Sequence, residues 1–397
     1  MHQIDTSAPH VFATVRARKN SAHRDITDLV TALKFTDSGT RRTNKIELTL
    51  DGEDGTLWGD DDLMRKGGLI HVEFGYPGAM RDIGDFSIKK VKGGRQTFTL
   101  ECYQAKRNKM VRTKKTRVFT GMKHSDVVRI LFRENGFSRF YVDNTDITYD
   151  TITQSEQSDW EFLQELADLD HYELFVDGGG AHYEKPKYGA KPKKRLRYIK
   201  GVVGVGMIED WDVDDIGSKV PGRIVLKGWD SVNGQPINVV ADGSLTKYEA
   251  LNETDDVASP AEGDATAEGE HGQDLVLPTG ARNYQEAKKL ADSLYKTYRH
   301  GAVKVTLKTV GDPWIFSRTI ILVEGIGPYL DGRFYTKEVV HSIGGGYGCE
   351  IKANKDGLNR KGKAKTKTGG EIPEDLIKGD EDEILGRGHI RHNIENI

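Results

Sequence analysis

The chain of 397 residues is long enough for two or three domains, and its 36% hydrophobic and 30% charged residues suit a soluble protein that assembles with partners. No run of eighteen apolar residues occurs and the N-terminus shows no signal pattern, so a membrane span is excluded and we expect synthesis in the cytoplasm. The formal net charge is only −3, although basic and acidic residues are segregated along the chain. Cys102 and Cys349 form neither a disulfide framework nor a CxxC metal motif, so we expect two buried, inert thiols.

The first hundred residues alternate between apolar and polar side chains. This period of two occurs in residues 46–50, 70–74 and 98–102, with Gly, Asp and Pro between the runs. The pattern is typical of antiparallel strands with one buried face. A small barrel over residues 1–118 is the natural closure, because a barrel leaves no exposed strand edge.

A helical insertion with a β-hairpin is predicted over residues 119–200. Its first helix has Ser125 as the expected N-cap and ends at Asn135 and Gly136. The second helix begins at Ser158, where Glu161 completes a capping box. Its apolar face has helical spacing and consists of Phe162, Leu163, Leu166 and Leu169. A hairpin follows through the Asp-Gly-Gly-Gly turn at residues 177–180.

A second β-rich region is predicted over residues 201–353, with a helix that begins at Asn283. Its predicted strands are residues 223–229, 303–307 and 319–323. Two β-rich halves of similar size suggest a structural duplication. We therefore predict a mainly β, α+β fold of two small β-barrel domains with a helical insertion between them.

Two further segments carry too little apolar surface to fold alone. Residues 249–274 are acidic and rich in small side chains, and we expect a mobile loop inside the second barrel. Residues 354–397 run from basic to acidic without periodicity, and we expect a flexible C-terminal tail or docking arm.

Three stretches carry a family resemblance. They are residues 97–131, residues 154–167, and residues 325–351 with their glycine-tyrosine turn before the last strand. Together they resemble the phage late control D family, the central baseplate hub proteins of phage tails. A similar module opens the spike protein of type VI secretion systems. The motif and core residues are Ser158, Asp159, Trp160, Phe162, Leu163, Leu166 and Ala167.

The resemblance implies a structural, non-enzymatic hub in the virion tail baseplate, assembled in the host cytoplasm. Each subunit of a homotrimer would contribute two barrels, so that a pseudo-sixfold ring meets the hexameric tail tube on one side and the trimeric spike on the other. The expected partners are the chain itself, the tail tube protein, the spike protein and other baseplate or distal tail proteins. DNA would pass through the channel without specific binding.

Three basic clusters favour docking of other proteins, with DNA contact as the alternative. They lie within residues 106–117, 185–197 and 360–367. The candidate docking or lumen residues are Lys106, Arg107, Lys109, Arg112, Lys114, Lys115, Arg117, Lys361, Lys363, Lys365 and Lys367.

Catalysis is the competing hypothesis. Acidic residues cluster around Trp211 and after Trp58, and paired carboxylates are what glycoside hydrolysis requires. A tail-associated peptidoglycan hydrolase is therefore one alternative, and the equivalent hub of a contractile injection or secretion particle is another. The histidines show no metal-ligand spacing and the glycine runs lack the helix of a phosphate site. We expect no catalytic residue, no metal and no cofactor.

Overall fold

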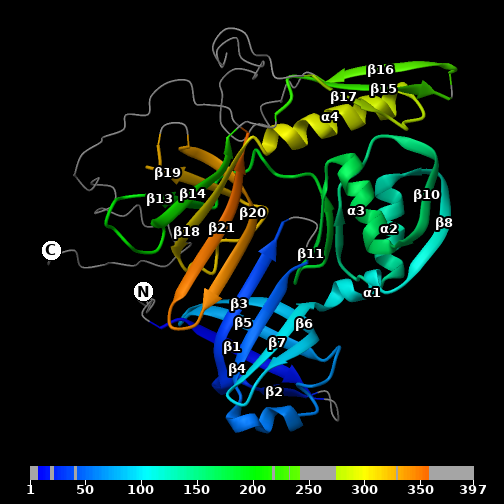
Figure 1. Cartoon of the computed structure of the whole chain (residues 1–397). Coiled ribbons are helices and arrows are strands. Elements are labelled where there is room, and N and C mark those ends of the chain that lie inside the picture. The colour runs from blue at the N-terminus through cyan, green and yellow to red at the C-terminus, as the bar shows by residue number, and fades with distance from the viewer. Residues whose placement is uncertain are drawn as a thin grey trace.

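The computed structural model describes residues 8–17, 22–39, 43–216, 220–231, 233–241, 274–327 and 330–356. The fold is mainly β, as predicted, with few helices (Figure 1). The predicted acidic loop 249–274 lies outside the described residues except for Asp274, and so does the predicted tail beyond residue 356.

The first β-rich half follows the alternation of its sequence. In each predicted run the apolar side chains are buried on one face, as in β4, where Ile46, Leu48 and Leu50 are fully buried. The strands are β1 (His10–Arg16), β2 (His23–Asp25), β3 (Val30–Ser38), β4 (Lys45–Asp51), β5 (Leu69–Tyr76), β6 (Ala79–Gly93) and β7 (Thr97–Gln104). Short 3-10 turns connect them, namely η1 (Thr27–Leu29), η2 (Glu53–Gly59) and, after β7, η3 (Ala105–Arg107).

The second β-rich half has its own set of strands, two of them, β18 and β19, close to the predicted runs. They are β13 (Lys194–Arg197), β14 (Ile208–Ile216), β18 (Val303–Val310), β19 (Ile320–Glu324), β20 (Gly332–Ile343) and β21 (Tyr347–Lys355).

The two halves share a single sheet, which the sequence did not predict. In the described residues the order is β14-β18-β21-β20-β3-β4-β7-β6-β5-β1-β2, with β19 and β13 attached beside β20. The seam between the halves is the antiparallel pair β3–β20, whose register runs from Glu338 opposite Ser38 to Ile343 opposite Leu33. One continuous hydrophobic core extends across this seam.

The helical insertion packs beside the seam with a core of its own (Figure 1). Its elements are α1 (Asn108–Val111), β8 (Lys114–Lys123), α2 (His124–Glu134), β9 (Phe140–Val142), β10 (Thr148–Ser158), α3 (Asp159–Asp170), β11 (Glu173–Val176) and β12 (Ala181–Glu184). β8 pairs with β10, and β11, β12 and β9 form a separate small sheet. Strand β8 runs across the predicted boundary at residue 118.

The helix starts in the insertion were predicted with mixed success. Ser158 caps α3, and the capping box with Glu161 is present. The prediction that Ser125 caps α2 was wrong, because the N-cap is Lys123 and Ser125 lies inside the first turn. Leu169 was also misassigned to the buried face of α3, since its side chain is 37% exposed. The end of α2 at Asn135 and Gly136 is confirmed.

A third unit lies beyond the insertion (Figure 1). It consists of β15 (Ile224–Asp230), β16 (Gln235–Ala241), β17 (Leu275–Pro278) and α4 (Tyr284–His300), which begins at Asn283 as predicted. Helix α4 also contacts α3, where Lys289 Nζ lies 2.6 Å from Asp170 Oδ1. Asp170 is buried and accepts from His124 as well, at 3.0 Å. This contact holds the third unit to the insertion.

We expect Trp160→Ala to lower the free energy of unfolding by about 3–5 kcal/mol. The indole is only 3% exposed within the core of the insertion, so its removal leaves a cavity. Chemical denaturation measures the loss, and Trp229→Ala, at a side chain that is 60% exposed, is the matched control. Equal stability of both variants would contradict this placement of α3.

Candidate functional site

The strands nearest the seam expose one long polar face, opposite the shared core. On this face, the residues that lie opposite one another on neighbouring strands are mostly charged or carry a hydroxyl group, with few apolar exceptions. Several are paired, as where Lys45 Nζ lies 2.6 Å from Glu47 and 3.4 Å from Glu101. The face comprises Asp210, Asp212, Thr306, Lys308, Glu350, Lys352, Val340, Ser342, Lys34, Thr36, Lys45, Glu47, Glu101, Tyr103, Lys90 and Lys92.

The two ends of this face carry opposite charge. At one end β14 exposes Asp210, Asp212 and Asp214, while Trp211 and Val213 turn toward the core. At the other end β6 exposes Lys90 and Lys92, with Lys89 also exposed and Val91 packed on the core. The alternation of these aspartates with Trp211 and Val213 is the sequence signal of a strand with one buried face.

These two ends also lack a partner strand in the described part of the chain. Among the described strands, β14 pairs with β18 alone. β6 pairs with β5 over its first part and with β7 over its second, so residues 89–93 have one free edge. Exposed strand edges are templates for pairing with another chain.

The strand order is repeated in the two halves. In the first half it is β3-β4-β7-β6, and in the second half it is β14-β18-β21-β20. If the four strands of each half are numbered along the chain, both halves place them in the sheet in the order one, two, four, three. The first strands, β3 and β14, are each 9 residues long, and the third strands, β6 and β20, each pair with a preceding strand before they form a hairpin. The duplication that the sequence suggested is therefore visible in the topology.

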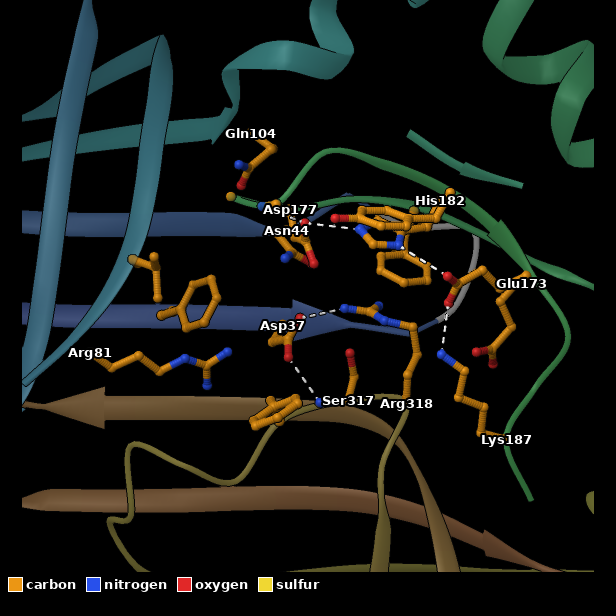
Figure 2. Close-up of a pocket in the computed structure, with 18 of the residues that line it drawn as sticks. Asp37, Asn44, Arg81, Gln104, Glu173, Asp177, His182, Lys187, Ser317 and Arg318 are labelled. Atoms are coloured by element: carbon orange, nitrogen blue, oxygen red, sulfur yellow. Dashed lines mark hydrogen bonds and ion pairs between the residues drawn. The ribbon is translucent and has the colours of Figure 1, made fainter. Parts of the chain in front are cut away.

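A pocket of 640 Å³ lies where the two halves and the insertion meet (Figure 2). Its lining comes from β3, β6, the β11–β12 hairpin and residues 316–318. Its charged groups pair with one another: His182 Nε2 lies 3.1 Å from Asp177, and Lys187 Nζ lies 3.1 Å from Glu184. The pocket is therefore a polar junction between three parts of the chain.

The ion pair of Asp37 and Arg318 is the centre of this junction (Figure 2). Asp37 on β3 is 2% exposed, accepts the N–H of Ser317 at 2.8 Å and lies 3.3 Å from Arg318 Nη2. Burial alone would raise the pKa of Asp37, but the guanidinium groups of Arg318 and Arg81 outweigh it and hold the pKa below its usual value. Arg318 also lies 4.1 Å above the ring of Phe175 in the insertion. One guanidinium thus contacts all three parts.

A buried histidine lies on the same seam. His341 on β20 is fully buried, stacks on Phe35 of β3 and bonds to Tyr347 Oη at 2.8 Å. Burial, with the nearby charge of Arg81, lowers the pKa of His341 to about 3. The ring is therefore neutral at physiological pH.

The motif residues of α3 form a structural core and not an exposed site. Trp160, Phe162, Leu163, Leu166 and Ala167 are all buried in the insertion. Asp159 is buried too, and its carboxylate accepts from Lys115 and Arg117, each at 2.7 Å.

The basic candidates of residues 106–117 divide into two groups. Lys115 and Arg117 are engaged by Asp159, and Arg107 lies 4.5 Å above the ring of Trp160, where burial lowers its pKa to about 10. Arg112 and Lys114 are exposed. The structure does not describe the side chains of Lys106 and Lys109, and Lys361, Lys363, Lys365 and Lys367 lie outside the described residues.

The acidic runs and the cysteines have structural surroundings. Asp210 lies 2.9 Å from Lys308 on the neighbouring strand, and Asp60 lies 2.6 Å from Arg24. Both cysteines are buried and free, and burial raises the pKa of each thiol. Among the described helices, none has the length and apolar character needed to cross a membrane.

Solved structures of phage tail proteins share this fold. The tail protein from Neisseria meningitidis MC58 has a TM-score of 0.63 at 13% identity, covering 88% of this chain and 98% of that one. The 43 kDa tail protein of prophage MuSo2 from Shewanella oneidensis has a TM-score of 0.61 at 11% identity, covering 88% and 99%. A type VI secretion component from E. coli, described as similar to bacteriophage T4 tail proteins gp27 and gp5, has a TM-score of 0.51 at 9% identity, covering 86% and 76%. The chain has the fold of phage tail proteins.

The family model described as Alg8 N-terminal domain matches residues 56–345, and the chain belongs to that family. A search of curated proteins finds no match. The tail-protein fold that the resemblance implied is confirmed, whereas the narrower assignment to the late control D family stays a prediction.

We expect Asp37→Asn to lower the free energy of unfolding by about 3–5 kcal/mol, because it leaves buried guanidinium groups without their counter-charge. Asp54→Asn is the matched control, since Asp54 pairs with Arg95 on the surface, where such pairs contribute about 0–1 kcal/mol. Denaturant midpoints and slopes measure both. A loss for Asp37→Asn no larger than for the control would contradict the role of this pair.

His341 predicts a pH dependence of stability. The unfolded chain binds a proton at this residue near pH 6.5 and the folded chain only near pH 3, so stability falls as the pH drops between these values. His341→Gln should reduce the slope of unfolding free energy against pH by about 1.4 kcal/mol per pH unit between pH 4 and 6. The exposed His10→Gln should leave it unchanged. An unaltered slope in His341→Gln would show that this histidine is protonated in the fold.

Proposed function

We propose that the chain is the structural hub of a phage tail baseplate, a homotrimeric symmetry adaptor between the hexameric tail tube and the trimeric spike. The observation that carries the proposal is the repeated strand order with two free and oppositely charged edges. Proteins of the same fold are described as tail proteins, and one is described as a secretion-system component. The equivalent hub of a contractile injection or secretion particle is the alternative setting for the same role.

The seam within the chain is the template for the contact between chains. Inside one subunit the third strand of the second half, β20, pairs with the first strand of the first half, β3. The equivalent strands with free edges are β6, the third strand of the first half, and β14, the first strand of the second half. Pairing β6 of one subunit with β14 of the next repeats the seam head to tail. A heterologous contact of this kind forms a closed ring when its rotation closes, and a ring of three subunits has six equivalent halves.

Charge supports the same pairing. If the seam's register is repeated, Asp214 of one subunit lies opposite Lys92 of its neighbour, and Asp212 and Lys90 lie diagonally beside this pair. Opposite charges on facing strands stabilise a pair, and like charges disfavour it. The arrangement therefore favours head-to-tail contacts and opposes pairing of two β14 edges or two β6 edges.

The polar face would line the channel of such a ring. Its lysines and carboxylates are interspersed and partly paired, as Lys352 is with Glu338 at 3.0 Å. A lumen of mixed sign offers little net attraction to phosphate, so DNA would pass without being held. The exposed Arg112 and Lys114 remain candidates for docking the tail tube, the spike or other baseplate proteins.

A non-enzymatic role is part of the proposal. Of the acidic residues that suggested a peptidoglycan hydrolase, those around Trp211 lie along the exposed face of β14, where Asp210 is paired with Lys308, and Asp60 after Trp58 is paired with Arg24. In the pocket, the carboxylates of Asp37, Asp177 and Glu184 each face a basic partner. Because these carboxylates have basic partners, we favour a structural role in a virion tail over catalysis.

A charge swap tests the ring. We expect light scattering to give three times the 44.3 kDa mass of the chain, alone or with tube protein present. Lys90→Glu with Lys92→Glu should weaken the trimer at least tenfold, and Asp212→Lys with Asp214→Lys should do the same. Combining all four substitutions restores complementary charge and should restore the trimer.

The matched control is Lys227→Glu with Lys288→Glu, two exposed lysines of the third unit, which belongs to neither edge, and it should leave the mass unchanged. A trimer that persists in both reversed pairs would place the interface elsewhere. A stable monomer that ignores tube protein would contradict the hub itself, and lysis of purified cell wall by the folded chain would favour the hydrolase.

A further inference from the structure

Four polar side chains converge on one face of the β5–β6 hairpin. His71 and Glu73 come from β5, and Asp82 and Asp85 come from β6. His71 Nδ1 lies 3.0 Å from Asp85 Oδ1. His71 Nε2 faces the other two carboxylates, at 3.4 Å from Asp82 Oδ1 and 3.6 Å from Glu73 Oε1.

A β-bulge brings the two aspartates to the same face. Residues 82 and 85 are three apart, so a regular strand would direct their side chains to opposite sides. The register instead shifts beside Val72, so that Asp85 lies opposite His71 and Asp82 opposite Glu73. Gly84 in the bulge has φ of +83°, which favours glycine, and its N–H donates to Asp82 Oδ1 at 2.6 Å. Bulges often redirect a side chain toward a functional site.

The spacing around Nε2 suits a metal ion better than a hydrogen bond. Direct N–H···O bonds measure about 2.7–3.2 Å, shorter than both separations here. Two ligand atoms held tetrahedrally by zinc at about 2.0–2.1 Å lie about 3.4 Å apart. The three ligand atoms of His71, Glu73 and Asp82 all lie within 4.8 Å of one another, and no other group of this kind occurs in the described part of the chain.

The negative charge of this group of side chains also favours the binding of a cation. Three carboxylates surround one imidazole, and within the described residues none of them has an ion pair with Lys or Arg. A protonated imidazole would neutralise only one of the three charges. A divalent ion neutralises two and leaves the ring neutral.

We propose that His71, Glu73 and Asp82 bind a divalent transition-metal ion such as Zn²⁺, which links β5 to β6, with Asp85 orienting the imidazole. A histidine ligand commonly donates its second N–H to a carboxylate, and the contact between Nδ1 and Asp85 has this form. One nitrogen and two carboxylate oxygens suit zinc and disfavour calcium and magnesium, which prefer oxygen ligands alone. The proposal does not depend on the trimer.

Calorimetric titration of the full chain with ZnCl₂ tests the site. Wild type should bind zinc in the micromolar range or tighter, with CaCl₂ and MgCl₂ giving no comparable heat. His71→Ala should lose one zinc equivalent while keeping its circular dichroism spectrum. Glu73→Gln and Asp82→Asn keep the side-chain volume and should each weaken the site at least tenfold. Asp85→Ala should weaken it by about 10–100-fold.

His182→Ala is the matched control, because His182 also lies between two carboxylates. Its partners, however, face different ring nitrogens, with Asp177 at Nε2 and Glu184 at Nδ1, so they do not converge on one point. This variant should bind zinc as wild type does. The proposal is overturned if His71→Ala retains the wild-type stoichiometry and affinity, or if wild type binds zinc only at millimolar concentrations.

Discussion

The antiparallel pairing of β3 with β20 is the contact on which the rest of the structure depends. It joins two β-rich halves that are far apart in sequence into one sheet with one core. The ion pair of Asp37 and Arg318 links the two halves beside this seam, and the guanidinium of Arg318 also lies over the ring of Phe175 in the insertion. Because the pair is buried, its geometry constrains the angle between the halves more than a surface ion pair would.

The pairing of β20 with β3 inside the chain also determines which strand edges remain unpaired. Since the halves have the same strand order, using β20 and β3 within the chain leaves their equivalents, β6 and β14, with free edges. Exposed edges usually carry features that prevent pairing. Here the two edges have opposite charge, which prevents each from pairing with itself and permits each to pair with the other. The proposed ring is therefore an extension of the contact that already holds each subunit together.

Much of the fold could be predicted from sequence, because local patterns determine it. The alternation in residues 46–50 and 98–102 gave the strands, and Ser158 with Glu161 gave the start of α3. Ser125 was misread because α2 continues directly from β8, so the chain enters the helix at Lys123 without a side-chain cap. The seam could not be predicted, since the pairing of β3 with β20 joins residues about three hundred positions apart. The group around His71 was missed for a related reason, because a bulge at Gly84 brings its aspartates together and no ligand spacing appears in the sequence.

The central claim is that β6 of one subunit pairs with β14 of the next, and disulfide trapping tests it most directly. The native cysteines are buried, so cysteines placed at Lys92 and Asp214 of one chain, which face each other if the seam's register is repeated, provide the accessible thiols. Facing positions on paired strands lie within the reach of a disulfide. We expect mild oxidation of this double variant to give covalent species up to a trimer on a non-reducing gel, while either single variant gives none above a dimer. Double-variant chains that remain monomeric after oxidation, although they are trimeric by light scattering, would contradict it.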